Sequence, residues 1–112
     1  DAIRAIHADP GKGWTVGLLA KRVALSPSRF AARFRETTGD SVMRYVAVWR
    51  ANIACRFLRD SEMSLSEVAH RVGYESLPAF SRAFKEQLGM PPAAWRASSS
   101  RGHDGSRLPI PR

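Results

Sequence analysis

Two short segments carry polar and basic side chains at helical spacing between phenylalanines. Residues 26–34 read SPSRFAARF, and residues 76–84 read SLPAFSRAF. At about 100° per residue, the two phenylalanines of each segment fall on one side of a helix. Ser28, Arg29, Arg33 and Arg82 then fall on the exposed side. Hydroxyl and guanidinium groups on such a face can donate hydrogen bonds to base edges or to phosphates.

Catalytic and metal-binding patterns are missing from the sequence. No nucleophile is spaced with a base, no glycine-rich loop resembles a phosphate cradle, and no acid and base are paired. The single cysteine, Cys55, cannot form an internal disulfide, and no Cys and His set has the spacing of a zinc site. We therefore expect no enzyme activity, no metal and no cofactor, and a reducing compartment.

The charge balance indicates the class of partner. The chain has 112 residues, and 18 Lys and Arg against 10 Asp and Glu give a net charge of +8. Such an excess favours a polyanion such as nucleic acid, or an acidic membrane surface. No apolar run approaches the roughly 18 residues that span a bilayer, and there is no signal-peptide pattern. We expect a cytoplasmic protein without a membrane partner.

The apolar pattern is helical throughout, and no segment alternates as a strand would. Thr15, the pair Ser26 and Pro27, and Ser64 in SLSE are typical helix starts. The predicted fold is all-α with about seven helices, near residues 2–7, 16–23, 27–38, 41–59, 64–72, 77–87 and 91–95. Residues 97–112 lack periodicity and are rich in Ser, Gly and Pro, which predicts a disordered tail.

One helical unit occurs twice. Ala20 and Val23 match Ala69 and Val72, and after one extra residue a longer series matches as well. In that series Phe30, Phe34, Glu36, Gly39 and Tyr45 correspond to Phe80, Phe84, Glu86, Gly89 and Trp95. Each copy has the outline of a helix-turn-helix, and the two copies flank the long fourth helix. The repeat is therefore predicted to duplicate a binding element.

Both copies resemble a known family. Residues 68–96, VAHRVGYESLPAFSRAFKEQLGMPPAAWR, are similar to the second helix-turn-helix of the AraC/XylS family of bacterial transcription regulators. Residues 19–46, LAKRVALSPSRFAARFRETTGDSVMRYV, look like the first. The resemblance implies a DNA-binding domain over residues 1–96, with units at 2–39 and 64–96 and a linker helix at 41–59. It also implies a separate sensor or dimerisation domain in a longer protein. Because the sequence begins at Asp1 and not at Met, we expect that this domain has been removed from the chain.

The same resemblance assigns the contact residues. The base-reading positions of the first unit fall on Ser28, Ala31 and Ala32, with Arg29 and Arg33 beside them. In the second unit they fall on Pro78, Ala79 and Arg82. Helical position, at about 100° per residue, adds Arg35 at the edge of the first exposed face and Lys85 at the rim of the second. The implied partner is double-stranded DNA, with RNA polymerase as a further partner because activators of this kind often touch it.

Two alternatives stay open at this point. The chain could be a helical adaptor whose basic face docks on an acidic protein, such as an RNA polymerase subunit. An RNA-binding helical domain is favoured less, because the exposed aromatic side chains that stack on bases are missing.

Overall fold

The computed structural model describes residues 1–100, and within this range the chain forms seven helices and no strand. The helices are α1 (Ala2–Ala8), α2 (Val16–Arg22), α3 (Pro27–Thr38), α4 (Val42–Asp60), α5 (Leu65–Arg71), α6 (Leu77–Leu88) and α7 (Pro92–Ser100). The predicted all-α class and the order of the elements are confirmed.

Local sequence signals define most helix ends. The first six helices begin behind a side chain that accepts a hydrogen bond from a first-turn amide, and these caps are Asp1, Thr15, Ser26, Ser41, Ser64 and Ser76. Such caps satisfy amides that have no partner inside the helix. The equivalent helices α3 and α6 both end at a glycine in the left-handed conformation, Gly39 and Gly89.

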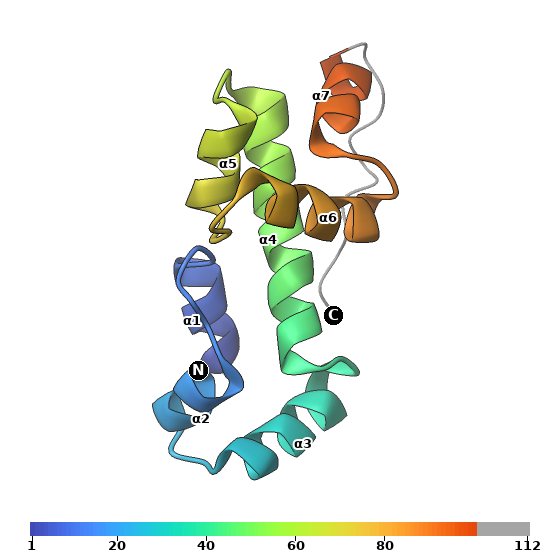
Figure 1. Cartoon of the computed structure of the whole chain (residues 1–112). Coiled ribbons are helices and arrows are strands. Elements are labelled where there is room, and N and C mark those ends of the chain that lie inside the picture. The colour runs from blue at the N-terminus through green and yellow to red at the C-terminus, as the bar shows by residue number, and fades with distance from the viewer. Residues whose placement is uncertain (101–112) are drawn as a thin grey trace.

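The helices form two units around α4, which runs through the length of the molecule (Figure 1). Helices α1 and α3 pack on its first half, α2 packs on α1 and α3, and α5–α7 pack on its second half. The first apolar cluster is built from Ala2, Ala5, Ile6, Trp14, Leu19, Ala20, Phe30, Phe34, Val42, Tyr45 and Val46. The second is built from Ala54, Cys55, Leu58, Val68, Ala69, Val72, Phe80, Phe84 and Trp95. The linker helix therefore belongs to both cores.

Helix α7 is longer than predicted. We expected it to end near Trp95 and a disordered tail to begin at residue 97, but α7 continues through Ser100. Periodicity is a poor guide here, because the last residues of α7 are small and polar and have little apolar stripe to reveal a helix. The rest of the expected tail, residues 101–112, lies outside the described residues.

Two residues on the phenylalanine side of α3 are not buried. Helical spacing places Pro27 and Thr37 on the side of Phe30 and Phe34, but both lie at the ends of the helix and are exposed. Thr38 is the buried threonine, and its hydroxyl donates to the Phe34 carbonyl oxygen at 2.8 Å. This bond satisfies a polar group at the end of the helix, which allows the residue to be buried.

Candidate nucleic-acid interface

Helix α3 presents most of its predicted contact residues to solvent. Phe30 and Phe34 anchor the helix in the first cluster, with ring centroids 5.7 Å apart. Among the predicted positions, Ala31 is half-buried, and the exposed ones are Ser28, Arg29, Ala32, Arg33 and Arg35. The opposite face of an anchored helix is thus available to a partner.

Helix α6 repeats this arrangement with different chemistry. Phe80 and Phe84 anchor it in the second cluster, with ring centroids 5.6 Å apart. Pro78, Arg82 and Lys85 are exposed. Ala79, a predicted base-reading position, is half-buried, and so is Ala83. The exposed face of α6 is therefore narrower and offers fewer hydrogen-bond donors than that of α3.

The two faces hold their arginines at different angles. At about 100° per residue, Arg82 lies about 180° from the midpoint of Phe80 and Phe84. The equivalent position on α3 is Ala32, whereas Arg29 and Arg33 lie about 120° and 80° from the phenylalanine midpoint. The second unit thus has a central arginine, and the first has two arginines on one flank.

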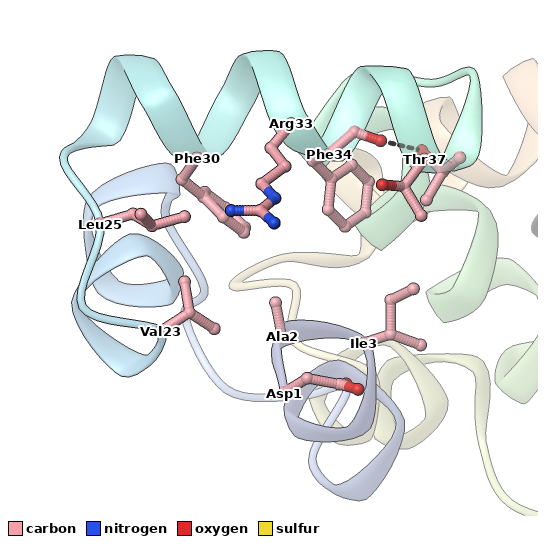
Figure 2. A pocket seen from close by; sticks show the side chains of 10 residues that line it. Asp1, Ala2, Ile3, Val23, Leu25, Phe30, Arg33, Phe34 and Thr37 are labelled. Atoms are coloured by element: carbon pink, nitrogen blue, oxygen red, sulfur yellow. Dashed lines mark hydrogen bonds between the residues drawn. The ribbon is translucent and has the colours of Figure 1, made fainter.

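Two hollows border the flank of α3. One, of about 370 Å³, is lined by Leu25, Arg29, Ala32, Arg33 and Glu36. The other, of about 340 Å³, lies between α3 and the start of α1. Figure 2 shows Arg33 extending from α3 between the rings of Phe30 and Phe34, over this second hollow. Arg33 is therefore exposed at the flank of the helix and borders both hollows.

The basic side chains of the two faces are free to bind an anion. Within residues 1–100 the ion pairs join Arg44 to Asp40 at 3.2 Å and Arg59 to Asp60 at 3.0 Å, and both lie on or beside α4. The side chains of the five basic residues on the two faces have no hydrogen-bond or ion-pair partner in this part of the chain: Arg29, Arg33, Arg35, Arg82 and Lys85.

Two other arginines have structural roles that the sequence did not reveal. Arg50 of the linker helix is half-buried and donates to the Pro10 and Lys12 carbonyl oxygens. Arg96 donates to the Leu58 carbonyl oxygen at 2.9 Å and to that of Met63 at 2.7 Å, around the end of α4. Their partners are 33 to 40 residues away, and no local pattern could have indicated them.

The described residues hold no group of three or more His, Cys, Asp or Glu side chains that could bind a metal ion. None of the helices in residues 1–100 is long and apolar enough to cross a membrane.

Comparison with known proteins identifies the family. A family model described as a helix-turn-helix domain matches residues 19–98, which run from the middle of α2 into α7 and include all of α3–α6. A Streptomyces lividans protein described as an AraC-like transcription regulator is 45% identical over 95 residues, which is 85% of this chain. The chain belongs to the AraC/XylS family. The transcriptional regulator AlkR of Acinetobacter baylyi is 37% identical over 99 residues.

The match covers only part of these AraC-like relatives. The aligned region is 88% of this chain but 32% of AlkR, and it is 31% of the Streptomyces lividans protein. The chain thus spans about a third of the length of the AraC-type relatives that it matches.

Solved structures of domains from other regulatory proteins share the fold. The DNA-binding domain of AdpA, a global transcriptional factor solved in complex with a target DNA, has a TM-score of 0.84 and 32% identity, covering 92% of this chain and 95% of that one. The C-terminal domain of AraT, a response regulator from Geobacillus stearothermophilus, has a TM-score of 0.83 and 26% identity, covering 87% and 81%. The AraC/XylS architecture of two helix-turn-helix units on one long helix is therefore confirmed.

Proposed function

We propose that the chain is the sequence-specific double-stranded DNA-binding part of a transcription regulator, with α3 and α6 in successive major grooves on one face of the duplex. The observation that carries this proposal is the pair of equivalent helices, each anchored by two phenylalanines and each exposing unpaired basic side chains. The likeness to the AdpA domain, which was solved with a target DNA, supports it.

The dimensions of the molecule fit this arrangement. Helix α4 has 19 residues and is therefore about 28 Å long at 1.5 Å per residue. One turn of duplex DNA is about 34 Å, and the chain extends 45 Å along its longest axis. Two units at opposite ends of α4 can thus reach two adjacent major grooves.

The proposed contacts divide into two kinds. Arg29, Arg33 and Arg82 can pair with guanine through two hydrogen bonds, while alanine and proline side chains can contact thymine methyl groups. Arg35 and Lys85, at the rims, are placed for phosphates, which fix register without carrying sequence information. These residue roles are part of the proposal.

Arg82→Ala tests base reading, and Lys85→Ala is its matched control on the same helix. The target is a duplex that the unaltered chain selects from a random pool, together with each single base-pair change of it. We expect Arg82→Ala to remove about 1–3 kcal/mol of discrimination at one position, as for a lost arginine–guanine pair. Lys85→Ala should weaken binding to all of these duplexes by a similar factor. Unchanged base preferences in Arg82→Ala would remove Arg82 from the reading face.

The same selection separates DNA binding from the adaptor alternative. A helical adaptor that docks on an acidic protein, such as an RNA polymerase subunit, would bind duplexes weakly and without sequence preference. A sequence-specific domain binds its site about 10³–10⁷ times more tightly than unrelated DNA. Failure to enrich any sequence over successive rounds would therefore contradict the proposal.

A further inference from the structure

The two units meet at a small junction near the middle of α4. Their apolar clusters share no residue. Between the clusters, α4 buries Val48, Ala51 and Asn52, which belong to neither. Beyond the continuity of α4, the placement of one unit relative to the other rests on the contacts made at this level.

Arg50 contacts both units at this junction. Its Nε donates to the Pro10 carbonyl oxygen at 2.9 Å, and its Nη2 donates to the Lys12 carbonyl oxygen at 2.8 Å, both in the loop between α1 and α2. Its guanidinium carbon also lies 5.3 Å from the ring centroid of Tyr74, in the turn between α5 and α6. Hydrogen bonds from a charged donor are stronger than neutral ones, and the aromatic face adds an attraction for the cation.

The backbones of the two units also approach closely here. A Cβ at Gly11 would lie 2.5 Å from the Arg71 carbonyl oxygen. A Cβ at Gly73 would lie 3.0 Å from the Gly11 carbonyl oxygen and 3.0 Å from Nη2 of Arg50. Figure 1 shows the same approach, with the loop that follows α1 reaching the end of α5. The missing side chains at these glycines let the loop and the turn close around Arg50.

Each side of the junction continues to a recognition helix. The Lys12 carbonyl oxygen also accepts from the Trp14 amide at 2.7 Å, and Trp14 belongs to the cluster that contains Phe30 of α3. On the other side, the ring of Tyr74 lies 5.7 Å from that of Phe80 of α6. Arg50 is thus joined to α3 and to α6 through short chains of packed groups.

We propose that Arg50 is a positioning residue that fixes the separation and angle of α3 and α6, and so fixes the spacing between the two DNA segments that the chain binds. This inference rests on the proposed function, because a fixed separation has consequences only if both helices bind one duplex. One inserted base pair moves the second segment by about 3.4 Å and rotates it by about 35°. A rigid junction therefore makes affinity sensitive to spacing.

The first experiment measures the cost of altered spacing. Arg50→Met keeps an unbranched aliphatic side chain but removes the donors. The probes are the selected duplex and the same duplex with one or two base pairs inserted between its two contacted segments. Binding through two linked modules raises affinity by about 10²–10⁴-fold, and the unaltered chain should lose most of this gain on the duplex with inserted base pairs. The affinity of Arg50→Met should fall by less than about tenfold on the same insertion, because a less rigid junction lets the second unit reach the displaced DNA segment.

A merely structural role would not produce this result. A partly unfolded variant binds every duplex less tightly by one common factor, so the ratio between the two spacings stays constant. Arg56→Met, an exposed arginine on the same helix, is the matched control and should keep the full spacing penalty. Arg50→Lys, which retains a charged donor, should restore part of the spacing penalty that Arg50→Met loses. If the ratio of affinities for the two spacings were the same in Arg50→Met as in the unaltered chain, the proposal would be overturned.

A second measurement needs no DNA. Spin labels at Glu36→Cys and Glu86→Cys, equivalent exposed positions on α3 and α6, report the distance between the helices in a Cys55→Ala background. We expect a narrow distance distribution, which Arg50→Met broadens. Equal widths with and without Arg50 would overturn the junction role. If the chain bound no duplex, the proposed function would fail, and this distribution would still test the junction.

Discussion

The turn of each helix-turn-helix unit contains a residue in the left-handed conformation, and the two units fill it differently. The first unit has Ala24, with φ 56°, and the second has Gly73, with φ 102°. A residue with a Cβ is disfavoured there by about 1–2 kcal/mol, whereas glycine is not. The first unit therefore carries backbone strain at a position where the second has none.

Ala24→Gly should stabilise the chain. Relief of strain of about 1–2 kcal/mol outweighs the entropic cost of glycine, about 0.5–1 kcal/mol, so the free energy of unfolding should rise by up to about 1.5 kcal/mol. Urea denaturation measures the change. Ala32→Gly, at an exposed position in the middle of α3, is the control and should lower stability by about 0.5–1 kcal/mol. A lower stability of Ala24→Gly would show that the turn is not strained.

The protonation of His7 is expected to make the stability of the first unit depend on pH. Its ring stacks on Trp49 with centroids 3.8 Å apart, and its Nε2 lies 3.0 Å from the Tyr45 hydroxyl. His7 as a whole is exposed, but the partial burial of its ring lowers its pKa below the usual 6.5. The unfolded chain therefore holds this proton more tightly, so the contribution to stability is present above about pH 6.5 and is lost as the pH falls through the lowered folded pKa.

The melting temperature should consequently fall on acidification from about pH 7.5 to about pH 5, and this fall should be smaller in His7→Gln. His70→Gln, which replaces a histidine outside the stacked group of His7, Tyr45 and Trp49, is the matched control. Identical pH profiles for His7→Gln and the unaltered chain would exclude His7 as a source of the effect.

At the scale of elements, the two recognition helices anchor separate cores. Phe34 of α3 and Phe84 of α6 are equivalent and buried, yet they belong to different clusters. Cys55 lies in the second cluster only, where burial raises the pKa of its thiol to about 12. A thiol that is neither ionised nor accessible does not react, so Cys55 reports opening of the second unit.

Phe84→Ala should destabilise the second unit by about 3–5 kcal/mol, as expected for a buried aromatic residue. The rate at which a thiol reagent labels Cys55 should rise accordingly. Phe34→Ala is the matched variant in the first unit, and it should accelerate this labelling much less. Equal acceleration by both variants would mean that the two units open together, against the partial independence expected from separate clusters.

At the scale of the whole molecule, charge governs association. The net charge is +8, and few of the basic side chains in the described residues are neutralised by ion pairs. Each phosphate that a Lys or Arg neutralises adds about 0.9 to the magnitude of the slope of log affinity against log salt. A domain that places two helices in two grooves needs several such contacts.

We therefore expect affinity for the selected duplex to fall steeply between about 50 and 200 mM salt. A titration series at several salt concentrations gives the slope. Arg59→Ala should leave it unchanged, because Arg59 is paired with Asp60 on α4. A slope near zero for the unaltered chain would contradict binding through the phosphate backbone.

Much of this architecture could be read from the sequence because its determinants are local or repeated. Ser26 and Ser64 cap the helices that they precede, and the phenylalanine pairs of α3 and α6 are buried as their spacing predicted. Capping depends on residues within one turn, and burial follows helical periodicity. The repeat then placed two equivalent units on either side of α4, which the fold confirms. The contact roles of individual residues on α3 and α6 stay predictions.

The tertiary structure alone decided how the units are joined. Arg50 and Arg96 look in the sequence like ordinary surface cations, but each donates to carbonyl oxygens more than thirty residues away. The close approach of Gly11 to Arg71 likewise depends on two segments that meet only when both units pack on α4. Helical periodicity specifies which side of a helix is buried but not which other residues that side packs against. The sequence by itself therefore determined the two units, and only the packed chain decided the junction that holds them in register.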